Sequence, residues 1–116
     1  MLSMTPYKFG NIILVPFPFT NQATTKKRPA VVISTEEYNN RRPDLIIMAI
    51  TSRLYQTNDL DEKVVADWQG AGLLKPSVFK PIITTIENTL VLKRLGALQN
   101  EDRHTLSEIL RNILGT

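Results

Sequence analysis

The sequence predicts a small, mainly β protein of the α+β class, in which a β-barrel or curled sheet carries one amphipathic helix at the C-terminus. Short apolar runs rich in β-branched residues, separated by Pro, Gly and polar residues, predict five or six strands as far as Leu98. From Asn100 the apolar residues recur at i, i+3 and i+4, which predicts a helix. A chain of 116 residues can bury one core, so we expect a single domain over residues 1–116.

The first strand is predicted at 11–15, where an apolar run lies between a glycine and a proline. The next segment, 16–20, contains two prolines, which cannot donate to a ladder, so we expect an extended edge or the start of a loop. Residues 21–28 are polar and basic, and a loop is expected there. The second strand, at 30–34, begins after a proline.

The middle of the chain is expected to alternate turns with further strands. Ser34 or Thr35 can cap a helical turn, and Pro81 limits its strand to a sheet edge or a bulge. The expected segments are a helical turn from 35, a turn at 39–43, a strand at 45–50, a polar loop at 54–61, a weak strand at 63–66, a turn at 70–72 and strands at 78–85 and 90–98.

The C-terminal helix is expected to begin with Asn100 as its N-cap and to end at Gly115. We expect its apolar stripe to pack on the barrel of its own chain. His104 lies about 200° around the helix from that stripe, so it should face solvent. The stripe consists of Leu106, Ile109, Leu110, Ile113 and Leu114.

Composition excludes several classes of site. The chain has no cysteine and one histidine, which excludes disulfides, cysteine nucleophiles, thiolate zinc sites and multi-histidine metal sites. The acidic run Asp59, Asp61, Glu62 lacks the glycine and terminal glutamate of a calcium loop and is expected to be a solvated loop. We therefore expect no metal and no cofactor. No apolar stretch is long enough to span a bilayer and residues 1–9 lack signal-peptide features, so a cytoplasmic protein without membrane contact is expected.

The positive charge is concentrated in the first half of the chain. The net charge is +3 overall, and residues 1–58 carry seven basic and three acidic side chains. Arg28 directly precedes a buried strand, where its guanidinium can be held in a fixed place, and Thr51 and Ser52 end another. These residues can form an anion site, because a fixed guanidinium donates two parallel hydrogen bonds to a phosphate. The alternative is ordinary surface charge beside strand-end polar residues.

Two segments, GNIILVPFPFT at 10–20 and KRPAVVIS at 27–34, resemble the MazF/PemK-like toxins of type II toxin–antitoxin systems. Shorter pieces agree in order, and the likeness covers about residues 7–114. These pieces are ITSR at 50–53, AGL at 71–73, KPSV at 75–78 and LGAL at 95–98.

This resemblance implies an SH3-like barrel, a homodimer, an antitoxin partner, and metal-independent, sequence-specific cleavage of single-stranded RNA. It implies that Arg28 and Thr51 are the catalytic pair. In that chemistry the 2′-hydroxyl attacks the adjacent phosphorus and expels the 5′-oxygen, leaving a cyclic phosphate. The residues expected to bind RNA or position the phosphate are Lys26, Lys27, Ser52, Arg53 and Thr20.

Two other functions stay open at this point. One is a non-catalytic barrel of the same shape that binds RNA or a protein. The other is a toxin that binds a protein target of the gyrase type. The sequence supplies no evident general base, since an arginine stays protonated at neutral pH. It also departs from the family pattern at Asn21, Ile50 and Pro81.

Overall fold

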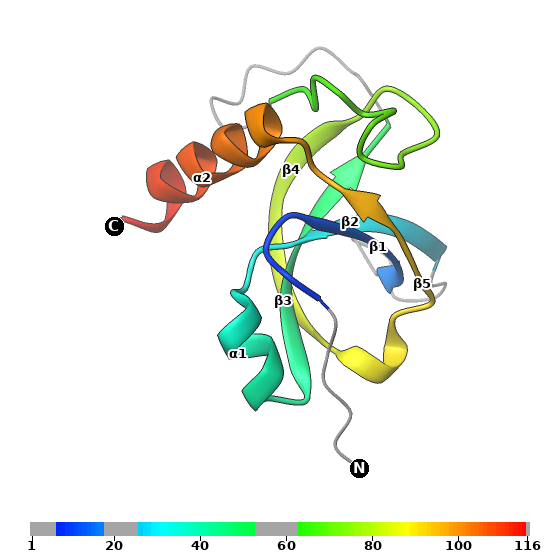
Figure 1. Cartoon of the computed structure of the whole chain (residues 1–116), viewed down its shortest axis with the longest axis vertical. Coiled ribbons are helices and arrows are strands. Elements are labelled where there is room, and N and C mark those ends of the chain that lie inside the picture. The colour runs from blue at the N-terminus through cyan, green and yellow to red at the C-terminus, as the bar shows by residue number, and fades with distance from the viewer. Residues whose placement is uncertain (1–6, 18–25, 53–62, 116) are drawn as a thin grey trace.

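The computed structural model describes residues 7–17, 26–52 and 63–115 of the chain. Its elements are β1 (Asn11–Phe17), β2 (Lys26–Val32), α1 (Glu36–Arg41), β3 (Asp44–Thr51), β4 (Val78–Glu87), the 3-10 helix η1 (Asn88–Leu90), β5 (Lys93–Ala97) and α2 (Asn100–Leu114). The strands form one antiparallel sheet in the spatial order β4-β3-β2-β1-β5. The sheet curls, with α2 beside the upper half of β4 and α1 beside the lower half of β3 (Figure 1). The predicted mainly β class with a C-terminal helix is confirmed.

Each face of the sheet carries its own apolar core, because successive side chains of a strand point to opposite faces. The helix-covered cluster lies on the face that packs against α2. The helix-free cluster lies on the other face. The buried members of the helix-covered cluster are Ile12, Val31, Met48, Ile50, Val65, Ala71, Leu73, Phe79, Leu98, Leu106 and Ile109. Those of the helix-free cluster are Ile13, Val15, Ala30, Val32, Leu45, Ile47 and Ala49.

The stripe of α2 packs on its own sheet, as predicted. Leu106 and Ile109 are buried in the helix-covered cluster, and Leu110 and Ile113 pack against it. Leu114 at the end of the helix remains exposed. Gly115 ends the helix in the left-handed conformation, with φ of 72°, which a glycine adopts without strain.

Two contacts attach the turn at 66–72 to the rest of the fold. The carboxylate of Asp102, which is buried in the first turn of α2, accepts hydrogen bonds from the backbone N–H groups of Ala66 and Asp67 at 2.8 Å each. Gly72 and Gly96 also lie against each other's segments. A Cβ on Gly72 would come within 2.2 Å of the Leu95 carbonyl oxygen, and one on Gly96 within 2.3 Å of the Ala71 carbonyl oxygen. The AGL and LGAL pieces therefore meet in space, and their glycines are required by this close backbone approach.

The helix in the connection between β2 and β3 is longer than the sequence predicts. Thr35 is the N-cap of α1, and its Oγ1 accepts from the Tyr38 N–H at 3.1 Å, as expected. The helix then continues through residues 39–41, where a turn was predicted. The reason is Asn39, which is fully buried and donates from Nδ2 to the carbonyl oxygens of Tyr7 and Ser34. The Ser34 hydroxyl in turn donates to Asn39 Oδ1.

Four sequence predictions need correction. Residues 26–28, expected in a loop, belong to β2, because they pair with β1 from Val15 to Phe17. The weak strand at 63–66 is reduced to one bridge between Val64 and Val78. The strand predicted at 90–98 is β5 alone, preceded by η1. The N-cap of α2 is Gln99, because Asn100 is already helical.

The predictions for the two proline-containing strands are confirmed where the structure describes them. β1 continues through Pro16 and Phe17, where it pairs with β2 alone, since its pairing with β5 stops at Leu14. β4 is the edge of the sheet, and its register with β3 shifts between Met48 and Ala49, beside Pro81. The polar loop predicted at 54–61 and the acidic run at 59–62 lie outside the described residues.

Candidate functional site

Arg28 and Thr51 lie on the neighbouring strands β2 and β3, beyond the last pair of the ladder between them. The ladder between β2 and β3 pairs Val32 with Ile47 and Ala30 with Ala49. Continuing the same register by two residues sets Arg28 opposite Thr51. Both strands alternate faces, so the two side chains leave the sheet on the face of the helix-free cluster, next to Ala30 and Ala49. Strand alternation thus gives a common face to the two residues that the sequence singled out for catalysis.

Pro29 explains why the ladder stops just before this pair. The carbonyl of Val32 accepts from the Gly10 N–H on the β1 side, so alternate residues of β2, Val31 and Pro29 among them, face β3. Proline has no N–H, and the ladder from β2 to β3 accordingly ends at Ala30 and Ala49. In the Arg-Pro-Ala sequence, Arg28 therefore pairs with β1, and the ladder with β3 ends at the residue after Pro29.

The immediate surroundings of Arg28 are basic. Arg28 is half-buried, and its Nε is shielded from solvent. Lys26 is exposed and stands two residues away on the same face, whereas Lys27 extends from the opposite face. Ser52 is exposed and directly follows half-buried Thr51. An arginine with a shielded Nε and an exposed lysine on the same face of β2 favours an anionic ligand such as a phosphodiester.

The remaining sequence-predicted residues contribute less to this geometry. Thr20 and Arg53 lie outside the described residues, so the structure gives them no place. His104 is exposed on α2 and lies 3.3 Å from Glu108, as expected for a solvent-facing histidine. Among the described residues, no group of three or more His, Cys, Asp or Glu side chains could hold a metal ion.

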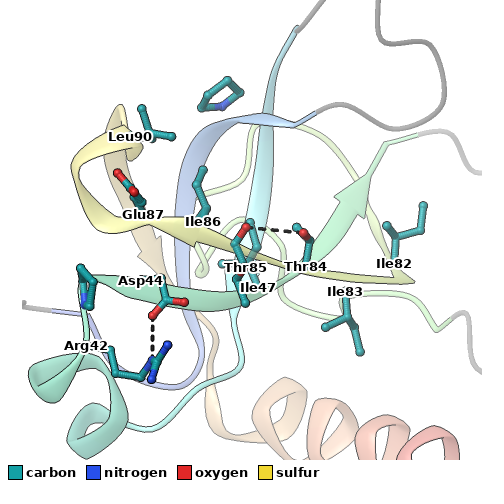
Figure 2. A pocket seen from close by; sticks show the side chains of 12 residues that line it. Arg42, Asp44, Ile47, Ile82, Ile83, Thr84, Thr85, Ile86, Glu87 and Leu90 are labelled. Carbon is teal, nitrogen blue, oxygen red and sulfur yellow. Dashed lines mark hydrogen bonds and ion pairs between the residues drawn. The ribbon is translucent and has the colours of Figure 1, made fainter.

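A second feature lies at the other end of β3, and the sequence analysis did not identify it. A groove of about 910 Å³ follows the second half of β4 (Figure 2). Ile47, Ile82, Ile86 and Leu90 supply its apolar lining. The sequence signal for this groove is the uncharged run from 81 to 86, of which the sequence analysis used only Pro81, as a residue that limits its strand to an edge or a bulge.

An ion pair borders this groove. The Arg42 Nε lies 3.0 Å from Asp44 Oδ1. The hydrogen bond from Asp44, together with its negative charge, raises the pKa of Arg42. The guanidinium also stands over the ring of Tyr38, 5.2 Å from its centroid.

Comparison with known proteins identifies relatives. A family model described as the PemK-like, MazF-like toxin of type II toxin–antitoxin systems matches residues 8–114. No curated protein matches the sequence. No helix in the described ranges is long and apolar enough to cross a membrane.

Solved structures with the same fold include three informative ones. MazF from Deinococcus radiodurans has a TM-score of 0.73 at 17% identity, with 98% of this chain and 100% of that chain covered. The Mycobacterium tuberculosis toxin MazF-mt6 has a TM-score of 0.71 at 20% identity, covering 90% and 96%. A mycobacterial endoribonuclease in complex with its cognate antitoxin has a TM-score of 0.70 at 14% identity, covering 97% and 96%. At these identities the likeness establishes the fold alone.

Proposed function

The chain belongs to the PemK-like, MazF-like toxins of type II toxin–antitoxin systems, and from this premise we propose that it is a metal-independent endoribonuclease acting on single-stranded RNA. Toxins of this family are generally endoribonucleases. The observation that supports the proposal for this chain is that Arg28 and Thr51 lie on the same face of neighbouring strands, two residues beyond the last pair of their ladder, Ala30 and Ala49. A single-stranded substrate fits this site because its bases can be splayed away from the backbone.

The proposed reaction is an internal transesterification. The 2′-oxygen forms a bond to the adjacent phosphorus, the bond from phosphorus to the 5′-oxygen breaks, and a 2′,3′-cyclic phosphate is left. The 2′-hydroxyl proton passes to a base, and the departing 5′-oxygen takes up a proton. Arg28 stabilises the charge that develops on the non-bridging oxygens, and Thr51 orients the phosphate or the attacking hydroxyl.

The neighbouring residues are proposed to bind the RNA and to take no part in the chemical step. Lys26 stands on the Arg28 face and is proposed to contact the RNA backbone, and Ser52 to hold a phosphate oxygen. Lys27, Arg53 and Thr20 are further proposed backbone contacts, of which Lys27 extends from the opposite face of β2.

The proposed partners are an antitoxin and a second copy of the chain, acting in the cytoplasm. Solved structures of the same fold include a MazE–MazF complex from Deinococcus radiodurans. We propose that the antitoxin of this chain covers the basic surface at Arg28 with an acidic segment, which silences cleavage. An antitoxin that bound Arg28→Ala and wild type equally and left the site open to RNA would contradict this arrangement.

The test is a cleavage assay in EDTA. Purified wild type is incubated with a mixed-sequence single-stranded RNA, and the product ends are mapped. Discrete cuts with cyclic phosphate ends are expected, and they should be lost in Arg28→Ala and Thr51→Ala. Arg41→Ala is the matched control, because Arg41 is an exposed arginine of α1 whose Nη2 lies 3.4 Å from Glu37. Absence of cutting by a folded wild type would contradict the proposal and favour a barrel that binds without cleaving.

A further inference from the structure

The proposed cleavage site lies where the ladder between β2 and β3 ends, and Pro29 stands at that end. The ladder has no register shift, and one step beyond its last pair Pro29 faces Ile50. Four residues away along each strand, the Ile33 N–H donates to the Ile46 carbonyl at 2.9 Å. Because hydrogen-bond directions repeat at every second residue, an N–H on residue 29 would donate to the Ile50 carbonyl. Proline has no N–H, so this bond cannot form.

A ladder that continued past Pro29 would use a second backbone donor as well. The next hydrogen-bonded pair in the same register would join Lys27 with Ser52, and the Ser52 N–H would donate to the Lys27 carbonyl. Among the residues that the structure describes, none accepts a hydrogen bond from the Ser52 N–H, and Ser52 is exposed. The end of the ladder therefore leaves this N–H available to a ligand.

The direction of the Ser52 N–H places it at the proposed site. The Ile46 N–H donates to Ser34 on the β2 side of β3, and alternation repeats this direction at Ser52. Ser52 directly follows Thr51, and the strand that it faces carries Arg28. A backbone N–H suits a phosphate whose charge grows during the reaction, because the chain already holds it in place and no side chain has to be ordered.

A second proline of the same strand pair acts on a different ladder. Pro16 of β1 pairs with Lys27 of β2. The Leu92 N–H donates to the Leu14 carbonyl at 2.8 Å, so Leu14 and Pro16 face the β5 side, where pairing with β5 ends at Leu14. An N–H on residue 16 would therefore point toward β5 and away from β3. Pro16 thus provides an internal comparison for Pro29.

We propose that Pro29 is a positioning residue of the cleavage site, which ends the ladder so that the Ser52 N–H donates to a non-bridging oxygen of the scissile phosphate. The inference rests on the proposed function and adds a backbone donor beside Arg28 and the Thr51 hydroxyl. Neither Pro29 nor the Ser52 N–H forms or breaks a covalent bond. The N–H stabilises the negative charge that develops on the phosphate as the 2′-oxygen attacks.

The variant Pro29→Ala tests the inference by adding one N–H. In this variant the ladder should extend, so that residue 29 donates to the Ile50 carbonyl and the Ser52 N–H donates to the Lys27 carbonyl. Hydrogen exchange measured by NMR should show the Ser52 amide about tenfold or more slower than in wild type. Titration with a non-cleavable 2′-deoxy oligonucleotide should shift the Ser52 amide resonance in wild type and leave it nearly unchanged in Pro29→Ala.

Cleavage should respond in parallel. Single-turnover cleavage at saturating RNA should fall about a hundredfold in Pro29→Ala, as expected for the loss of one donor to a developing oxyanion. The denaturation midpoint should stay close to that of wild type, because the added hydrogen bond offsets the greater freedom of the unfolded chain. N-methylalanine at position 29, introduced by peptide ligation, has no N–H and no ring, and it should restore cleavage. Pro16→Ala is the matched control and should cleave like wild type.

Three results would overturn the inference. The first is equal exchange of the Ser52 amide in wild type and Pro29→Ala. The second is wild-type cleavage by Pro29→Ala although its Ser52 amide is protected. The third is a wild-type Ser52 amide that the oligonucleotide does not shift. Failure of the proposed function would look different, because a wild type that cuts no RNA while the oligonucleotide still shifts its Ser52 amide would lack the activity and keep the phosphate donor.

Discussion

The two ends of β3 carry different chemistry. At the Thr51 end, a hydroxyl follows a fully buried run and lies on the same face of the sheet as half-buried Arg28 and exposed Lys26. At the Asp44 end, an ion pair with Arg42 borders an apolar groove along the second half of β4. The residues at the Thr51 end are therefore basic and polar, whereas those along the groove are mostly apolar.

The difference has a common physical origin in how β3 is paired. At the Thr51 end, Pro29 lacks the N–H group that would continue the ladder between β2 and β3. The ladder therefore ends before the polar residues Arg28 and Thr51. At the Asp44 end, the ladder between β3 and β4 continues to Glu87, and β4 is the edge of the sheet formed by the described strands. The pairing of β3 with β2 thus ends before Thr51, whereas its pairing with β4 spans the whole strand.

The largest effect is expected from truncating a fully buried side chain of the helix-covered cluster. Phe79 is fully buried and pairs with Ile50, next to Thr51. Phe79→Ala should lower the free energy of unfolding by about 3–5 kcal/mol, because it leaves a cavity in the helix-covered cluster. Chemical denaturation measures this loss. Leu74→Ala, at a side chain 90% exposed, should stay within about 0.5 kcal/mol of wild type. An equal loss in both variants would refute the assignment of the core.

Removing the hydroxyl at the polar end should affect chemistry without affecting stability. Thr51→Ala should slow single-turnover RNA cleavage about a hundredfold, as expected for the loss of one group that positions charge in the transition state. Thr51→Ser keeps the hydroxyl and should stay within about tenfold of wild type. If serine and alanine were equally slow, the methyl group rather than the hydroxyl of Thr51 would be what matters.

A smaller effect should distinguish the two faces of β2. Lys26 shares the face of Arg28, and Lys27 extends from the other. Lys26→Ala should reduce the slope of log binding constant against log salt by about 0.7 for single-stranded RNA, which corresponds to one lost phosphate contact. Lys27→Ala should change that slope less. Fluorescence titration of the cleavage-deficient Arg28→Ala background at several salt concentrations measures both, and a reversed order would place the RNA on the opposite face.

The smallest effect is expected at the ion pair of the apolar end. Asp44→Asn weakens the hydrogen bond and removes the negative charge that together raise the pKa of Arg42, but the guanidinium stays protonated because an arginine is protonated at neutral pH without such a partner. RNA cleavage rates should match those of wild type from pH 6 to pH 9. A change in the rate would show that the two ends of β3 are coupled rather than independent.

The sequence was sufficient for the parts of the fold that its apolar pattern controls. The buried runs of β1, β2 and β3, a cap at Ser34 or Thr35, the stripe of α2 and the helix end at Gly115 were all predicted from local signals. The site pair Arg28 and Thr51 was also named from the sequence, with their roles taken from the family resemblance. Strand alternation gives these two residues a shared face, and their roles stay a prediction.

Other features depend on contacts between distant segments, which a local pattern cannot reveal. Residues 26–28 are polar like a loop and become strand only by pairing with β1. Asp102 looked like an ordinary acidic residue of a first helical turn, yet it is 1% exposed and holds the backbone of Ala66 and Asp67. The position of β4 at the edge of the described sheet follows from the strand order, which becomes known only when the sheet is assembled.

The most direct test of the central claim is a double-mutant cycle on Arg28 and Thr51. Single-turnover cleavage of one defined RNA in EDTA is measured for wild type, Arg28→Ala, Thr51→Ala and the double variant. If the register makes the two residues one catalytic unit, the double variant should be no slower than the slower single variant. If the two losses multiplied instead, Arg28 and Thr51 would act independently, and the shared site would be contradicted.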